Sequence, residues 1–438
     1  MAAVACELEM TTPAQPSPHV QPKARLLAVL GPGLITGASD DDPSGIATYS
    51  QTGAQFGYLP TWSLLFSYPL MVAVQIISAR LGRTTGLGIA GNLRKFYPNS
   101  VVYACVALLL VANVINVGAD IGAMADAVRV LVGGPQIAYV LAFGIICVAM
   151  QVYLSYKPYV SVLKWLTLAL FAYIATLFFV QVGWSSLARS FFIPHLSLSK
   201  DYLTAIVAIL GTTISPYLFF WQSSQEVEDI QAVPERKALA SAPEQAEEAE
   251  ARISLDTFVG MGFSNIVALA IMVTAAATLH ASGITQIETS AQAAEALKPL
   301  AGVMAGTIFA LGIVGTGLLA VPVLAGSAAY AVGETLRWPT GLDRKPGQAK
   351  AFYATIVIAT LIGVGLNFSP INPIRALYWS AVINGVVAVP IMAMMMLMAA
   401  QSRVMGQRAI GGRLLAFGWL STAVMAVTAG AMIVTLVF

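Results

Sequence analysis

Charged residues are scarce in this sequence. Lys, Arg, Asp and Glu make up 10% of its 438 residues, whereas hydrophobic residues make up 58%. A soluble globular domain usually contains about 25% charged residues, so the chain lacks the charge that a water-facing surface requires. A lipid-facing surface requires none, and the composition therefore predicts a membrane protein. The net charge of +2 is too small to indicate a nucleic-acid partner.

Cysteine and histidine are also rare, with three residues of each. The cysteines are scattered and form no CxxC or Cys/His spacing, which argues against a thiolate metal site and against a disulfide framework. No histidine falls inside a predicted membrane span. The sequence contains no visible nucleophile–base pair and no nucleotide-binding loop, so we expect no enzyme activity and no cofactor.

Long apolar stretches, in contrast, are abundant. Residues 1–25 are polar and contain four prolines, which predicts a disordered cytoplasmic tail. A membrane-spanning helix needs about 20 apolar residues, and eleven later stretches are predicted to span. They are 28–56, 61–79, 101–130, 137–154, 158–182, 202–224, 255–279, 302–333, 351–366, 376–400 and 412–437, of which the first and sixth are interrupted.

Basic residues alternate between the loops. With the amino terminus in the cytoplasm, 18 of the 23 Lys and Arg residues fall on the inner side. The outer side then has Arg129, Arg189, Lys200, Lys298 and Arg375. Because cytoplasmic loops carry an excess of Lys and Arg, we predict this orientation, with the carboxyl terminus outside. The expected location is the inner (plasma) membrane of a bacterium, where the lipid bilayer surrounds a multi-pass chain.

Three adjacent acids, Asp40, Asp41 and Asp42, lie within the first apolar span and precede Pro43. A charge at the bilayer centre costs about 2.5–3.5 kcal/mol on insertion scales. Proline also pushes the residue before it out of the helical region, so we predict that the helix opens here. Unwound backbone at this depth is tolerated where it lines a cavity. Free carbonyl oxygens and carboxylates in such a cavity form a site for a hard cation.

The sixth span is interrupted in the same way between Gly211 and Tyr217, where Pro216 frees carbonyl oxygens around Thr212. Matching interruptions in two five-helix halves are typical of inverted-repeat transporters with a site near the bilayer midplane. We therefore expect an all-α polytopic membrane protein with 11 transmembrane helices. Its parts are a first repeat (26–182), a second repeat (201–400) with a cytoplasmic loop (226–254), and an eleventh helix (412–437).

With these breaks, the chain resembles the Nramp family of divalent-metal transporters, and more closely its branch of Nramp-related magnesium transporters. The resemblance extends over most of the chain from Gly31. Its motifs are Gly31-Pro32-Gly33 leading to Asp42-Pro43-Ser44-Gly45, the stretch from Gln75 to Gly82 with Thr85-Gly86, and Ile214-Ser215-Pro216-Tyr217. The resemblance implies a LeuT-type fold with broken helices 1 and 6, and a divalent metal ion as the transported substrate.

The resemblance also implies a set of metal-site residues. The family's metal-binding aspartate falls on Asp42, and its asparagine falls on Gly45, which has no side-chain ligand. The carbonyl donor of helix six falls on Thr212, the methionine ligand on Ser215, and the motif histidine on Tyr217. Further candidates for lining the cavity are Asp41, Ser44, Asn116, Asp120 and Asn384.

Two of these positions depart from the family pattern in a way that changes the expected ion. A thioether is a soft ligand that favours Mn²⁺ over Mg²⁺, and Ser215 replaces it with a hydroxyl or with space. Gly45 enlarges the cavity and leaves Asp42 as the main charged ligand. Because Mg²⁺ usually keeps several waters around one or two carboxylates, we expect Mg²⁺ uptake by alternating access, with Mn²⁺ as a further substrate.

The sequence gives little support for proton coupling. The family's acidic pair in helix three falls on Asn116 and Ala119, neither of which titrates, which leaves Asp120 as the candidate for a second site or a proton acceptor. A uniporter is energetically adequate, because a membrane potential of about 100 mV contributes ~4.6 kcal/mol to the uptake of a dication. The alternatives are a proton-coupled Mn²⁺/Fe²⁺ carrier and a LeuT-type carrier of organic solutes, whose anionic groups the three acids would repel.

Overall fold

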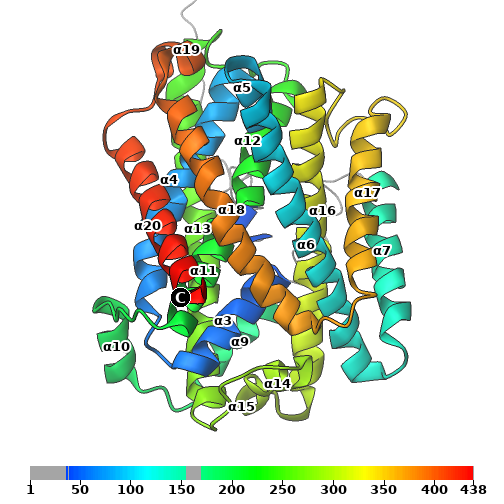
Figure 1. Cartoon of the computed structure of the whole chain (residues 1–438), viewed down its shortest axis with the longest axis vertical. Helices are drawn as coiled ribbons and strands as arrows, with labels where there is room; N and C mark the ends of the chain where they lie inside the picture. Colours follow the sequence, from blue (N-terminus) through cyan, green and yellow to red (C-terminus); the bar gives the residue numbers. More distant parts are fainter. Residues whose placement is uncertain (1–35, 38, 154–168, 438) are drawn as a thin grey trace, which may run out of the picture.

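The chain forms a bundle of helices (Figure 1). The computed structural model describes residues 36–37, 39–153 and 169–437, and these residues form helices and no strands. The predicted tail (1–25), the Gly31–Gly33 motif and residues 158–168 of the predicted fifth span lie outside this part of the chain. The described part of the fifth span contains the short helix α9 (Phe171–Thr176).

Eight helical stretches of the described chain are long and apolar enough to cross a membrane. They are α4 (Trp62–Thr85), α6 (Asn99–Val132), α7 (Gln136–Tyr153), α11 with α12 (Lys200–Ala232), a stretch around α13 (Pro243–His280), a stretch around α16 (Lys298–Leu336), α18 (Pro373–Ala400) and α20 (Gly412–Val437). The shorter apolar helix α17 (Lys350–Leu366) and the half-helix α3 (Pro43–Phe56) coincide with two further predicted spans. The predicted all-α architecture is therefore confirmed.

The bundle is apolar outside and has polar groups inside. Large apolar side chains such as Ile145, Leu361 and Val427 are more than half exposed, while Asp42 and Asp120 are fully buried. In water this arrangement would leave the exposed apolar surface unfavourably hydrated. In lipid the same surface is solvated by acyl chains, and the polar interior is available for a site.

The helices beside the two breaks pack in matching pairs. Half-helix α3 packs against α13 (Ala246–Ala275), and half-helix α12 (Pro216–Ala232) packs against α4. In the same way α6 packs against α7, and α16 (Ala305–Leu336) packs against α17. The corresponding helices α6 and α16 also contact each other along the bundle. The pairs α3–α13 and α12–α4 join the two halves, and the pairs α6–α7 and α16–α17 lie within them, so each half makes the same set of contacts, as expected of an inverted repeat.

The equivalent connectors of the two halves lie at opposite ends of the bundle. Helix α5 (Ile89–Phe96) joins α4 to α6, and helices α14 (Ser290–Glu295) and α15 (Lys298–Ala301) join α13 to α16. Figure 1 shows α5 at one end, with α19 (Ser402–Met405), and α14 and α15 at the other, with α10 (Trp184–Phe192). We name these the α5 end and the α14 end. The opposite placement is the relation expected of an inverted repeat.

The connector between α12 and α13 is shorter than predicted. In place of a loop over 226–254, α12 continues to Ala232 and α13 begins at Ala246. Acidic residues in the first turn of α13 favour helix formation, because they lie near the positive end of the helix dipole. The extended helices also bring Glu226 of α12 to Arg252 of α13, where they form a buried ion pair of 2.6 Å.

Candidate functional site

The first span opens immediately before Pro43, as predicted. Asp42 has extended backbone angles (φ −66°, ψ 171°) and caps the amino terminus of α3. Its Oδ1 accepts hydrogen bonds from the Gly45 backbone N–H (2.7 Å) and from the Ser44 hydroxyl (2.6 Å). Because the cap fixes the carboxylate at the start of the half-helix, one oxygen is held by α3 itself and the other faces the bundle interior.

The sixth span opens between Thr213, the last residue of α11 (Lys200–Thr213), and Pro216, the first residue of α12. The proline nitrogen carries no proton, so it cannot bond to a carbonyl of the preceding turn. The Ser215 hydroxyl partly replaces that donor, since its Oγ donates to the Gly211 carbonyl (2.5 Å) and to the Thr212 carbonyl (2.9 Å). Ser215 thus stabilises the open end of α11, and its hydroxyl lies beside the carbonyl predicted to bind metal.

The two breaks face each other inside the bundle. The Tyr217 hydroxyl donates to the Ser39 carbonyl (3.0 Å) and lies 3.3 Å from Oδ2 of Asp42. A Cβ placed on Gly45 would lie 3.1 Å from Oγ1 of Thr212, so the glycine permits a close approach of the second break. The structure therefore brings together all five residues predicted for the metal site.

Helices α6 and α18 complete this arrangement. The Asn116 side-chain amide of α6 donates to Oδ2 of Asp42 (3.0 Å), and its own carbonyl oxygen accepts from the Ser380 hydroxyl of α18 (2.6 Å). Asn384 lies one turn further along α18, is 1% exposed, and neither atom of its amide has a hydrogen-bond partner within the described residues. Polar groups of α3, α6 and α12 therefore contact the Asp42 carboxylate, and Ser380 of α18 contacts it indirectly through Asn116.

Four buried acids lie in this region without a countercharge. Asp40, Asp41, Asp42 and Asp120 are each at most 1% exposed, and none forms an ion pair with a described basic residue. Asp40 accepts a hydrogen bond from Ser264 of α13, but both oxygens of Asp120 lack a partner in the described part of the chain. Burial of unpaired carboxylates is unfavourable, and a bound cation would offset it.

The donor set around Asp42 consists of oxygen and amide groups. Within the described residues no group of three or more His, Cys, Asp or Glu side chains is arranged to hold a metal ion. A cation at Oδ2 of Asp42 would meet this carboxylate together with neutral groups such as the Tyr217 hydroxyl. Sites of this kind suit a hard divalent cation that keeps part of its water shell.

Two contacts of the site were not predicted from the sequence. Ser380 orients Asn116, and Ser264 bonds to Asp40. Ser380 lies one turn before Asn384 on α18, so the i, i+4 relation to a predicted cavity residue was a usable signal. Ser264 is one of two serines in α13, the other being Ser254, and no local pattern distinguishes it.

The sequence matches the model of one protein family and is similar to named transporter proteins. The model of the Nramp family, described as natural resistance-associated macrophage protein-like, matches residues 33–435. A divalent metal cation transporter MntH of Aeromonas hydrophila is 30% identical over 79% of this chain and 81% of its own length. The protein of the same name from Yersinia enterocolitica is 31% identical over 67% of this chain and 69% of its own length.

The fold also has solved counterparts. The structure of a manganese transporter from Eremococcus coleocola, bound to an aromatic bis-isothiourea compound, covers 92% of this chain and 85% of its own, with a TM-score of 0.71 and 16% identity. A point mutant of that transporter covers 95% and 87%, with a TM-score of 0.72 and 16% identity. At this identity the likeness establishes the fold, and it agrees with the LeuT-type architecture of broken first and sixth helices.

Proposed function

The chain belongs to the Nramp family, and from this premise we propose that it transports divalent metal ions across a membrane by alternating access. The observation that carries the proposal is the position of Asp42, whose carboxylate lies between the two helix breaks and contacts Asn116 and Tyr217. The relatives described above support it, because both are named divalent metal cation transporters.

In this proposal the residues of the breaks have different roles. Asp42 is the charged ligand, and the Thr212 carbonyl is a neutral ligand. Ser215 holds that carbonyl, since its hydroxyl bonds to it at 2.9 Å. Tyr217 and Asn116 orient the Asp42 carboxylate, and Gly45 leaves room for water of the ion. Asp41, Ser44, Asp120 and Asn384 line the surrounding polar interior.

We further propose that Mg²⁺ is the main substrate, as in the Nramp-related magnesium transporters, and that Mn²⁺ is carried less well. Ser215 offers oxygen where a thioether would offer sulfur, and a hard ion prefers oxygen. Because Asp42 is the one charged ligand in this proposal, much of the coordination shell of the ion is left to water. Mg²⁺ gives up its waters reluctantly, so a site with few protein ligands suits it.

The remaining alternative is a proton-coupled Mn²⁺ or Fe²⁺ carrier, and one observation favours it. Asp120 is buried on α6, one turn beyond Asn116, and has no hydrogen-bond partner among the described residues. Such a carboxyl can bind a proton or a second cation. We retain uniport as the proposal, because Asn116 and Ala119 cannot titrate and the membrane potential alone is an adequate driving force.

The orientation and the repeat boundaries are also proposals. We propose that the α5 end faces the cytoplasm of a bacterium and the α14 end faces outward. The α5 end has Arg94 and Lys95 of α5 and Arg403, which bonds to the Phe96 carbonyl. The α14 end has Lys298 of α15 and Arg375, which is paired with Glu288, and an excess of Lys and Arg is typical of the cytoplasmic side. The repeats then correspond to 26–182 and 201–400, with 412–437 as an added helix.

One experiment tests substrate and coupling together. The purified protein is placed in liposomes that contain a Mg²⁺ dye, or a Mn²⁺ dye, and a pH dye. The proposal expects Mg²⁺ uptake driven by a negative internal potential, with no acidification inside. Mn²⁺ uptake accompanied by acidification would instead establish the proton-coupled carrier, and uptake of neither ion would overturn the proposed function.

A further inference from the structure

A polar stripe follows one face of α3 from the candidate site toward the α14 end. Ser44, Thr48, Gln51 and Gln55 are spaced four, three and four residues apart, so their side chains share one face of the helix. At 1.5 Å per residue this face extends about 16 Å. Thr48 is 0% exposed, and its hydroxyl has no hydrogen-bond partner within the described residues. Buried polar groups along one helix face are unusual in an apolar core and indicate a path for a polar species.

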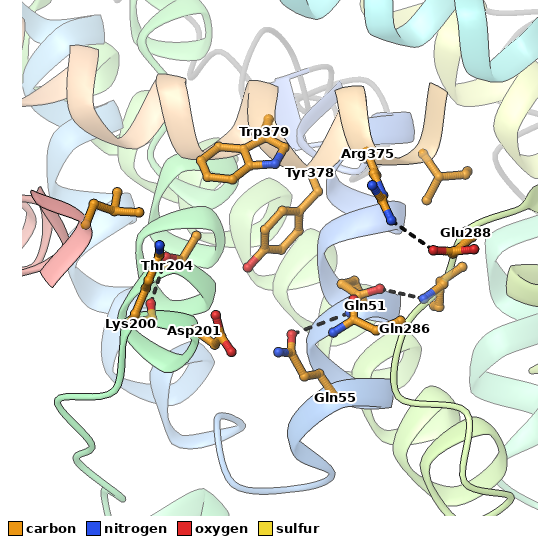
Figure 2. A pocket seen from close by; sticks show the side chains of 13 residues that line it. Gln51, Gln55, Lys200, Asp201, Thr204, Gln286, Glu288, Arg375, Tyr378 and Trp379 are labelled. Atoms are coloured by element: carbon orange, nitrogen blue, oxygen red, sulfur yellow. Dashed lines mark hydrogen bonds and ion pairs between the residues drawn. The ribbon is translucent and has the colours of Figure 1, made fainter. Parts of the chain in front are cut away.

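The stripe ends in a cavity of about 280 Å³ at the α14 end (Figure 2). Its walls come from α3, from the first two turns of α11 and α18, from the segment that precedes α14, and from the end of α20. Most of the lining side chains are polar, among them Gln51, Gln55, Lys200, Asp201, Glu288 and Arg375. Figure 2 shows Gln55, Asp201 and Tyr378 converging on the same space.

Some charged side chains of the cavity form ion pairs and others do not. Glu288 and Arg375 form an ion pair of 2.8 Å and largely cancel each other. Asp201 forms no ion pair with any described basic residue, and Lys200 forms none with any described acid. Asp201 therefore remains the carboxylate available to a cation, while Lys200 opposes its field. A site with this balance binds weakly, which suits capture followed by release.

The size and chemistry of the cavity fit an ion with its water shell. A water molecule occupies about 30 Å³ in the liquid, so six waters need roughly 180 Å³, which the cavity can hold. Coordinated waters are hydrogen-bond donors, and the carboxylate of Asp201 and the amide oxygens of the glutamines are acceptors. The cavity can therefore bind a hydrated ion through its coordinated waters, without direct bonds between the metal and protein oxygens.

We propose that this cavity is a separate capture site for a fully hydrated divalent cation, with Asp201 as its charged residue. The inference rests on the proposed function and adds a binding step that precedes the one at Asp42. The ion keeps its shell in the cavity and exchanges waters for protein oxygens only at the helix breaks.

Gln51 separates the two positions. Its amide nitrogen donates to the Thr285 carbonyl (3.2 Å) and to the Gln286 side chain (3.1 Å), and its oxygen accepts from the Ile287 backbone N–H (2.8 Å). The side chain thereby fastens the segment before α14 to α3 and forms the inner wall of the cavity. An ion that moves along the stripe from the cavity toward Thr48 must displace these bonds.

The test compares three substitutions in the full-length protein in liposomes. Asp201→Asn removes the attracting charge, Lys200→Gln removes the opposing charge, and Glu295→Gln removes an outer acid that is paired with Lys298 (2.9 Å) and lies outside the cavity lining. We expect Asp201→Asn to raise the KM for Mg²⁺ about five-fold, Lys200→Gln to lower it, and Glu295→Gln to leave it unchanged. The maximal rate stays within two-fold in all three.

Cobalt(III) hexaammine provides the second measurement, because its ammonia shell does not exchange. It can occupy the capture site but cannot be ligated by Asp42. We expect competitive inhibition of Mg²⁺ uptake that weakens about five-fold in Asp201→Asn. Equal inhibition of Asp201→Asn and Glu295→Gln, or a loss of maximal rate in place of a change in KM, would overturn the capture site.

The capture site and the proposed function can fail separately. Binding of cobalt(III) hexaammine to detergent-purified protein is measured by calorimetry in the wild type, in Asp42→Asn and in Asp201→Asn. Binding that needs Asp201 and not Asp42 supports a separate site even where no divalent ion is transported. Binding that needs Asp42 and not Asp201 refutes the capture site and leaves the proposed function standing.

Discussion

Replacing Asp42 separates its role as a helix cap from its role as a ligand. In Asp42→Asn the side-chain oxygen can still accept from the Gly45 N–H, which it contacts at 2.7 Å, whereas in Asp42→Ala the cap is lost. Both variants lack the charge that faces the cation. Removing one partner of a buried charge pair costs about 3–5 kcal/mol, and each 1.4 kcal/mol is tenfold in affinity. We therefore expect both variants to lose at least about two decades of apparent affinity for Mg²⁺.

Stability should distinguish the two variants. Loss of an N-cap costs about 1 kcal/mol, and Asp42→Ala also leaves the amide of Asn116 and the hydroxyl of Tyr217 with fewer partners, at about 1–3 kcal/mol per unsatisfied group. Asp42→Asn keeps the cap and removes a buried charge that has no described basic partner. We expect Asp42→Ala to lower the melting temperature and Asp42→Asn to leave it unchanged or raise it.

The assay combines uptake in liposomes with thermal unfolding of the same purified samples. An Asn variant that is as stable as the wild type and does not transport identifies a functional residue, since its defect cannot be attributed to folding. Mg²⁺ uptake by Asp42→Asn at close to the wild-type KM would refute the reasoning, because the charge of residue 42 would then not be needed. Equal destabilisation by Asn and Ala would refute the capping argument alone.

Three further predictions concern neighbours of Asp42. Ser215→Met exchanges a hydroxyl that bonds to two carbonyls for a thioether, so the ratio of Mg²⁺ to Mn²⁺ uptake should fall in a competition assay. Asn116→Ala removes a direct contact of the carboxylate and should raise the KM for Mg²⁺ about 10-fold. Ser380→Ala acts on the carboxylate only through Asn116, so it should raise the KM less. Asp120→Asn replaces a buried carboxyl that has no described partner with a neutral amide, so the melting temperature should rise. A uniporter should keep its Mg²⁺ uptake rate in this variant. An uptake rate reduced to half would favour proton coupling.

The breaks were predictable because their causes are local. Pro43 and Pro216 act on the residues just before them, and both helices restart at the proline itself. The same is true of the long apolar spans, whose length alone identifies them. The connector between α12 and α13 was predicted less well, since the ion pair of Glu226 and Arg252 that joins the extended helices links residues far apart in the chain.

The sequence was sufficient to predict which residues belong to the site, but it was not sufficient to predict the contacts between them. Asp42, Thr212 and Tyr217 could be named because they lie at the breaks. The sequence could not show that Ser215 turns back to the end of α11, because its rotamer depends on which carbonyls the break leaves free. Nor could it show that Asn116 reaches Asp42, because the two residues are joined only by the packing of α6 against α3.

The two oxygens of Asp42 connect ion binding to motion. Oδ1 is held by the N–H of Gly45 and the hydroxyl of Ser44, which belong to the same half-helix, and its contacts move with α3 as one body. Oδ2 is held by Asn116 of α6 and Tyr217 of α12, which are separate helices. A cation that approaches from the bundle interior meets Oδ2 beside these two groups, so the arrangement of α3, α6 and α12 decides how Oδ2 is presented to the ion. Under the proposed function, a pivot of the half-helix α3 therefore changes the surroundings of Oδ2 and leaves the contacts of Oδ1 intact, which connects ion binding to the motion of transport.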